Sequence, residues 1–258
     1  MNTHCNKKEL TGLTLLLIVL TAGVSLLLSQ PPLPQDLSYH QFVDSRTLFN
    51  IANFNNVISN LPFLLVGTIG LYKLLISRQL TILNELKTAY IILFSASCLV
   101  AFGSAYYHLS PDNLSLIWDR TPMSIAFMSL YAIIIGEFIS TKLGKQLLLP
   151  LILAGLTSVI YWYLTESWNA GDLRFYILVQ FIPILTMPVI LIFFKSAFDN
   201  QYGYWWLLSA YFIAKILEHF DAEVYELSLI ISGHSLKHVF AALGLYLLIK
   251  HYHFRKHG

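Results

Sequence analysis

Long apolar runs separated by short polar stretches make up most of the sequence. A helix needs roughly 20 mostly apolar residues to cross the hydrocarbon core of a bilayer. Eight runs are close to that length, and they cover residues 10–29, 57–76, 88–109, 120–140, 147–164, 174–194, 203–219 and 228–250. The seventh run is short and polar at its end. The pattern predicts an all-α polytopic membrane protein with eight transmembrane helices.

The first apolar run follows Lys7 and Lys8, as the apolar part of a signal peptide does. It is longer than the usual signal core of about 7 to 15 residues, and the following LLLSQPPLP shows no small-x-small cleavage site. We therefore interpret residues 10–29 as a retained helix. The prolines of the next stretch, SQPPLPQDLSYHQFVDSR, disfavour a helix and predict an extended segment.

Composition supports the membrane class and adds little about partners. Apolar residues make up 56% of the chain and charged residues 12%, which is typical of a membrane protein rather than a soluble domain. A net charge of +2 gives no reason to expect a nucleic-acid partner. The two cysteines, Cys5 near the start and Cys98 inside an apolar run, predict no disulfide between them.

Basic residues are concentrated on one side of the predicted bundle. With a cytoplasmic N-terminus, the inner side holds Lys7, Lys8, Lys73, Arg78, Lys87, Lys142, Lys145, Lys195, Lys250, Arg255 and Lys256. The outer side holds Arg46, Arg120, Arg174 and, near a helix end, Lys215. Because basic loops stay cytoplasmic, we expect both termini in the cytoplasm and a short outer loop at residues 110–119.

Ionisable side chains inside spans are functional candidates, because a charged residue at mid-membrane costs roughly 2.5 to 3.5 kcal/mol on insertion scales. In the stretch ISGHSLKHVFAALG, His234 and His238 are four residues apart, so a helix presents both on one face. The last helix, entered from outside near residue 228, places them one to three turns deep. His108 reaches a similar depth on the third helix, with Ser104 on the same face and one turn deeper.

Three histidines from two helices at one level predict a zinc site with an open fourth position for water, as catalytic zinc requires. Imidazole also suits iron, copper and nickel, so the spacing does not select the metal. Zinc lowers the pKa of its bound water to about 7, which generates a nucleophile at neutral pH. Asp119, at the start of the fourth predicted helix, is placed to take and return protons.

Structural interpretations stay open for each of these residues. A single interfacial histidine is often just a hydrogen-bonded structural group. Ser104, with Gly103 and Ala105, is also typical of close packing between helices. Asp119 can form an interfacial ion pair with Arg120 or cap the helix N-terminus.

Other polar residues have weaker functional signals. Asp112 in SPDN indicates turn chemistry. In KILEHFDAEVYE, Glu218 and Asp221 can orient a ligand histidine, or Lys215 and Glu218 can form a buried pair, and we favour a structural role. Four further histidines are expected to be solvated and without a role: His40, His251, His253 and His257.

The order Ser104, His108, Asp119 and then GHSLKH, with His234 and His238, resembles the alkaline ceramidases. These belong to a superfamily of seven-helix membrane hydrolases that includes the adiponectin-receptor-like proteins. The stretches NFNNVISNLPFLLVG and WDRTP are also similar to that family.

The resemblance covers residues 53–250 and leaves the first helix outside the seven-helix core. It therefore implies two parts. Residues 1–52 would form an N-terminal transmembrane helix and an outer segment, and residues 53–258 a seven-helix hydrolase core with a short cytoplasmic tail.

The resemblance also implies roles. His108, His234 and His238 would be zinc ligands, Ser104 would stabilise the developing oxyanion or the zinc water, and Asp119 would transfer protons. The implied reaction is cleavage of an N-acyl membrane lipid by a zinc-activated water, giving a fatty acid and an amine, which is a sphingoid base if the lipid is ceramide. Two alternatives remain: a lipid-binding receptor or regulatory protein with structural zinc, and a hydrolase of a different acyl lipid.

One departure from the family concerns calcium. Eukaryotic ceramidases of this type have an acidic N-terminal calcium site, whose last ligand is a glutamate before an FWN-like stretch. Here Asn53 occupies that position before FNN, and only Asp36 and Asp44 are clear upstream carboxylates. A calcium site therefore has little support.

Overall fold

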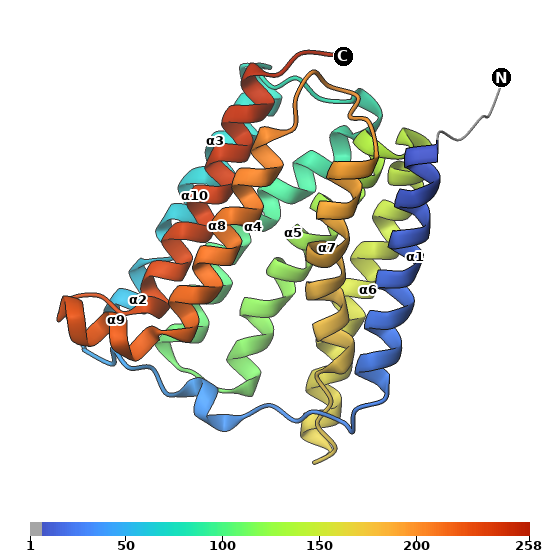
Figure 1. The fold of residues 1–258 in the computed structure, drawn as a ribbon. Coiled ribbons are helices and arrows are strands. Elements are labelled where there is room, and N and C mark those ends of the chain that lie inside the picture. Colours follow the sequence, from blue (N-terminus) through green and yellow to red (C-terminus); the bar gives the residue numbers. More distant parts are fainter. Residues whose placement is uncertain (1–6) are drawn as a thin grey trace.

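The computed structural model describes residues 7–258, which form a bundle of helices without a β-strand (Figure 1). The α-helices are α1 (Lys7–Leu28), α2 (Phe54–Ile58), α3 (Leu61–Leu71), α4 (Lys87–Leu109), α5 (Asn113–Phe138), α6 (Thr141–Ser167), α7 (Arg174–Phe193), α8 (Tyr202–His219), α9 (Asp221–Ser228) and α10 (Gly233–Phe254). Short helical turns occupy Leu37–His40, Tyr72–Ile76 and Asn84–Leu86. The predicted all-α class is confirmed.

Helices occur at all eight predicted spans. Among residues 7–258, six are long and apolar enough to cross a membrane: α1, the run Phe54–Ile76 that contains α2 and α3, α4 with the turn before it, α5, α6 and α7. The seventh and eighth predicted spans correspond to α8 and α10. Both contain ionisable residues, such as Lys215 in α8 and Lys237 in α10, so their composition alone does not mark them as spans.

The predicted outer loop at residues 110–119 is wrong for most of its length. Helix α5 begins at Asn113, because Asp112 caps it. The Ser115 backbone N–H donates to Asp112 Oδ1 at 2.6 Å, and the Asp112 N–H donates to Ser115 Oγ at 3.0 Å, which forms a capping box. Asp119 therefore lies in the second turn of a helix rather than at its start.

The last long helix also begins later than predicted. Leu229 ends α9 in the left-handed conformation, with φ of 55°, and Ser232 caps α10 by accepting a hydrogen bond from the Ser235 backbone N–H at 3.2 Å. His234 therefore lies in the first turn of α10 and His238 in the second. The helix begins at Gly233 rather than near residue 228, and the depth of the two histidines in the bilayer stays a prediction.

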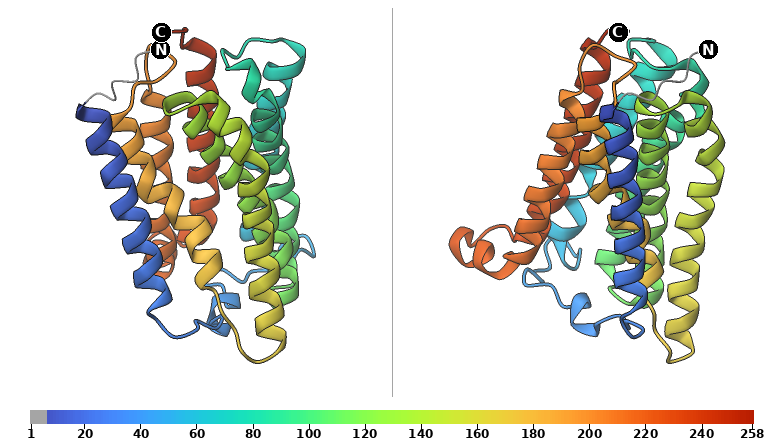
Figure 2. Two further views of the ribbon diagram at one scale, coloured as in Figure 1. Left: turned by 90° about the vertical axis from the view of Figure 1, so that its right-hand side faces the viewer. Right: turned by 45° about the vertical axis from the view of Figure 1, so that its right-hand side comes forward.

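The helices are arranged so that Lys7 and the C-terminal residues lie at the same end of the bundle, which we call the terminal end (Figure 1). The opposite end is called the site end. Helix α4 packs along α5, α8 along α10 and α5 along α6, whereas α1 packs on α7 at the edge of the bundle (Figure 2). The segment of residues 29–53, called the crossing segment, runs from α1 across the site end to α2 (Figure 1).

A buried ion pair holds the terminal end together. Arg255 Nη2 lies 2.7 Å from Glu137 Oε1, and both side chains are fully buried. Tyr204 donates to Glu137 Oε2 at 2.7 Å, and Tyr90 donates to the other carboxylate oxygen. The network joins α4, α5 and α8 to the C-terminal residues. Arg255, predicted among the basic residues of the inner side, is therefore a core residue.

Candidate active site

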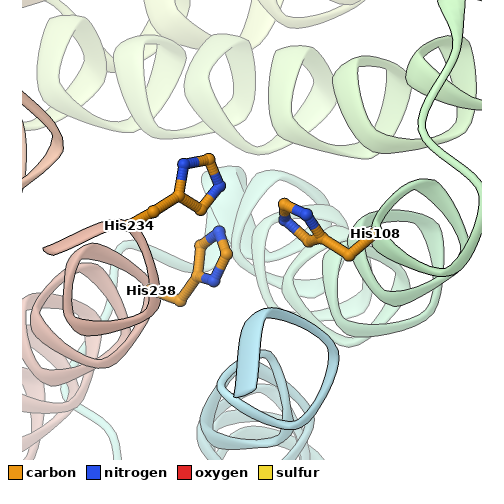
Figure 3. A group of neighbouring side chains, drawn as sticks. All are labelled: His108, His234 and His238. Atoms are coloured by element: carbon orange, nitrogen blue, oxygen red, sulfur yellow. The ribbon is translucent and has the colours of Figure 1, made fainter. Parts of the chain in front are cut away.

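Three histidines from two helices meet at the site end (Figure 3). His108 lies in the last turn of α4, and His234 and His238 lie in the first two turns of α10. One ring nitrogen of each lies within 4.8 Å of those of the other two, and all three side chains are buried. We call these residues the histidine cluster. Among residues 7–258 it is the one group of histidine, cysteine and acidic side chains with such close ligand atoms.

The hydrogen bonds of the rings fit a metal. Ser59 Oγ lies 2.8 Å from His238 Nδ1 and donates its own proton to the Asn56 carbonyl oxygen at 3.1 Å. Because that hydroxyl proton is used, Ser59 accepts the proton of His238 Nδ1, which leaves the Nε2 lone pair free. His108 Nδ1 and His234 Nε2 are buried without a hydrogen-bond partner among the described residues. Buried polar atoms need partners, and a metal shared by three imidazoles provides them.

The crossing segment covers the histidine cluster. The ring of Phe42 lies 4.7 Å from that of His108 and 5.0 Å from that of His234, measured between centroids. Near it, His40 lies 3.0 Å from both the Tyr107 hydroxyl and Asn113 Oδ1. The prediction that His40 is solvated was therefore wrong, and the segment does not extend away from the bundle. It packs over the site and shields it from water.

Asparagines in the stretch NFNN fix the two helix ends that carry the cluster. Asn53 Nδ2 donates to the His108 carbonyl oxygen at 2.8 Å. Asn56 Oδ1 accepts from the Ser235 hydroxyl at 2.7 Å, and Asn56 Nδ2 donates to the Asp44 carbonyl oxygen at 3.0 Å. A carboxylate at position 53 has no proton to donate to that carbonyl, so this contact requires the amide.

The two carboxylates of the crossing segment, Asp36 and Asp44, accept hydrogen bonds from groups of the protein. Asp44 accepts from Arg46 at 2.8 and 2.9 Å and from Asn55 at 2.8 Å. Burial alone raises the pKa of Asp44, but these hydrogen bonds hold it below its usual value. Asp36 accepts from the Ser38 backbone N–H at 2.8 Å. Both carboxylates thus have protein partners, and the absence of a calcium site stays a prediction.

Ser104 and Asp119 lie beside the histidine cluster, on facing helices. Both are at least nine-tenths buried, line one cavity with the three histidines, and lie close enough for the Ser104 hydroxyl to interact with the Asp119 carboxylate. The structure thus brings together all five predicted site residues. Their roles stay predictions.

A glycine and a proline bring α4 and α5 together at this level. Pro122 has no backbone N–H, so the Trp118 carbonyl oxygen four residues earlier loses its usual helical partner. That oxygen faces Gly103 of α4, where a Cβ atom would lie only 1.9 Å from it. The two backbones therefore approach each other closely next to Ser104 and Asp119.

Gly103→Ala is expected to force α4 and α5 apart, to lower stability by about 1–3 kcal/mol through overpacking, and to reduce turnover by displacing Ser104 from Asp119. Thermal unfolding and activity of detergent-purified protein measure both effects. Gly23→Ala is the matched control, because a Cβ at Gly23 meets no atom within 4 Å. A Gly103→Ala variant with the wild-type melting temperature would show that α4 and α5 accommodate a Cβ atom at position 103 without a cost in stability.

The cavity below the cluster has a volume of about 400 Å³ and is mainly apolar. Its apolar wall is formed by residues of the bundle interior, including Leu130, Ile134, Met187 and Leu245. Its polar wall contains Arg120, Lys215, Glu218 and Lys237. The space therefore offers an apolar path for an acyl chain next to a polar region beside the histidines.

Two acidic residues at the junction of α8 and α9, Glu218 and Asp221, have defined partners. Glu218 binds Lys215 Nζ at 2.6 Å and Lys237 Nζ at 2.5 Å, so it holds two lysines and no histidine. Asp221 Oδ1 accepts from the backbone N–H of His234 at 2.7 Å. Asp221 thus fixes the main chain of a candidate ligand, which agrees with the structural role that we favoured.

Comparison with known families adds one decisive observation. The ceramidase family matches residues 46–257, which is most of the chain. The chain belongs to the ceramidase family. No curated protein sequence and no solved structure matches it. Membership of the ceramidase family supports a lipid amide hydrolase, and the apolar helices and the cavity agree with a membrane lipid as the substrate.

Several residues of this ceramidase-family site were missed in the sequence. Ser59 and Asn56 lie in NFNNVISN, which the resemblance singled out, but nothing in the stretch shows that they reach α10. Phe42 and His40 lie in a segment whose prolines indicated only extended backbone. Cys5 lies outside the described residues, so the prediction that it forms no disulfide with Cys98 stays a prediction.

Proposed function

We propose that this ceramidase-family protein is a zinc-dependent integral-membrane hydrolase, which splits an N-acyl lipid into a fatty acid and an amine. His108, His234 and His238 hold the metal. The observation that carries the proposal is the set of three buried ring nitrogens within 4.8 Å of one another, placed on a mainly apolar cavity. A bilayer lipid with its acyl chain along the apolar wall presents its amide to that cluster.

Zinc in such a site supplies a Lewis acid and lowers the pKa of water. Asp119 takes a proton from the attacking water and returns it to the leaving amine, which has to leave as a neutral molecule. Ser104 donates a hydrogen bond to the amide oxygen, on which negative charge develops. Ser59 holds the His238 ring by accepting its Nδ1 proton, and Phe42 excludes water.

The proposal places both chain ends in the cytoplasm and the site on the other side of the membrane. The support for this orientation is that most basic residues lie at the terminal end, in the helix ends, connections and C-terminal tail there: Lys7, Lys8, Lys73, Arg78, Lys87, Lys142, Lys145, Lys195, Lys250, Arg255 and Lys256. Labelling with a membrane-impermeant thiol reagent, on cysteines introduced at Lys145 and at the exposed Leu227, measures which end faces outward.

The direct test is hydrolysis by detergent-purified protein. With ceramide and a panel of other N-acyl lipids, we expect fatty acid and amine to appear in equal amounts. A strong chelator should abolish the release, and one equivalent of zinc should restore it. Cleavage of ester lipids alone would indicate a hydrolase of another acyl lipid. Tight zinc binding without turnover of any lipid would indicate a lipid-binding protein with a structural metal.

A further inference from the structure

The polar wall of the cavity carries excess positive charge. Apart from histidines and tyrosines, its ionisable residues are two carboxylates, Asp119 and Glu218, and three cations, Arg120, Lys215 and Lys237. The two lysines share the one carboxylate of Glu218. A divalent metal on the histidine cluster would add two further positive charges. Such a surface inside a low-dielectric bundle attracts an anion.

Arg120 is the cavity cation that lacks an anionic partner. It is 94% buried, since 6% of its surface is exposed, and its guanidinium lies 4.1 Å from the Trp162 ring centroid and 4.7 Å from that of Tyr176. Its Nη2 donates to Gln35 Oε1 at 2.6 Å, a neutral acceptor. Its Nη1 has no hydrogen-bond partner, and within residues 7–258 no carboxylate forms an ion pair with it. The alternative of an Asp119–Arg120 ion pair was therefore wrong.

A buried guanidinium without an anion is costly, and ring contacts compensate for only part of that cost. The Trp162 and Tyr176 rings and Gln35 fix the orientation of Arg120, while one nitrogen with free N–H groups remains on a residue that lines the cavity. Guanidinium nitrogens bind carboxylate and phosphate oxygens better than neutral groups. These are the features of a preformed anion subsite.

We propose that the amine half of the substrate carries an anionic group, a carboxylate or a phosphate, and that Arg120 binds it. This inference rests on the proposed amide hydrolysis, because it concerns the amine half of the lipid whose acyl half that proposal describes. The acyl chain lies along the apolar wall, the amide at the histidine cluster, and the anion at Arg120, with Lys237 adding positive charge beside the histidines. A neutral lipid leaves Arg120 Nη1 unpaired and is therefore a poorer substrate.

The test compares N-oleoylglycine with N-oleoylethanolamine, which share an acyl chain and an amide and differ in headgroup charge. For wild-type protein we expect kcat/KM to be about 10-fold or more higher for the glycine amide, since hydrogen bonds to charged groups are among the stronger ones. Arg120→Gln should remove this preference by raising KM for the glycine amide, with little change for the ethanolamide. Arg174→Gln is the matched control, because Arg174 pairs with Asp172 and does not line the cavity.

Binding without turnover separates this inference from the proposed function. We expect N-oleoylglycine to raise the melting temperature of chelator-treated wild-type protein more than N-oleoylethanolamine does, and Arg120→Gln to remove the difference. If this shift occurs while neither amide is cleaved, the anion subsite stands and amide hydrolysis fails. If both amides are cleaved with equal kcat/KM, the subsite fails and hydrolysis stands.

A further comparison uses oleate, the fatty-acid product. If oleate stabilises the protein as well as N-oleoylglycine and Arg120→Gln removes both effects, Arg120 binds the acyl product, and the inference is overturned. If Arg120→Gln does not fold, the melting temperature of wild-type protein with each of the three compounds still tests the inference. N-oleoylglycine is expected to raise it more than N-oleoylethanolamine and more than oleate.

Discussion

His238→Ala is expected to reduce bound zinc from about one atom per chain, the content of a mononuclear site, to background and to abolish fatty-acid release with it. The substitution leaves two imidazoles of the cluster, which are too few for a site that also binds water. It also removes the ring that Ser59 orients. Elemental analysis of purified protein and an amide-hydrolysis assay on the same preparation measure both losses.

The matched control for this variant is His253→Ala. His253 is also on α10, but near the terminal end, where its Nδ1 lies 3.0 Å from the Gln79 carbonyl oxygen. Zinc content and turnover should stay at wild-type values in this control. A folded His238→Ala protein that keeps both zinc and activity would show that the histidine cluster is not the metal site.

Asp119→Asn is expected to lower kcat by about 10² to 10⁴, the usual contribution of a general acid–base group, while zinc content and KM change little. Asparagine has nearly the same shape as aspartate but cannot carry the proton from water to the leaving amine. The pH dependence of the remaining activity should lose the limb that belongs to Asp119. Steady-state kinetics across pH together with elemental analysis distinguish these effects.

Asp112→Asn provides the control on the same helix. Asp112 caps α5, and asparagine caps helices about as well as aspartate. This variant should therefore retain stability and activity. Loss of zinc in Asp119→Asn would instead mean that Asp119 supports the metal site, and unchanged kcat would assign proton transfer to another group, such as Glu218.

Part of this site could be predicted from local sequence rules. His234 and His238 share a face because they are four residues apart on a helix, and the structure presents them so. The boundaries were less accurate, because the apolar pattern marks the lipid-crossing part of a helix rather than its hydrogen-bonded ends. The Asp112 capping box and the Leu229 break moved two helix starts by several residues.

Hydropathy identifies most of the membrane-spanning helices but not all of them. Long apolar runs identified α1, the run Phe54–Ile76 and α4 to α7, because transfer of such residues to lipid is favourable wherever they pack. Helices α8 and α10 are in the bundle although they carry lysines and histidines, of which Lys215, His234, Lys237 and His238 line the cavity. Neighbouring helices give those polar groups partners, and a hydropathy count cannot include them.

The sequence by itself determined the membrane class, the all-α fold and the family, because these depend on hydropathy, helical period and the order of a few residues along the chain. Only the tertiary structure decided which groups meet. Ser59 reaches His238 across 179 positions of sequence, Gly103 contacts the Trp118 carbonyl, and Arg120 remains without an anion. The physical reason is that such contacts arise from the packing of separate helices, and the local forces that form each helix carry no information about its neighbours.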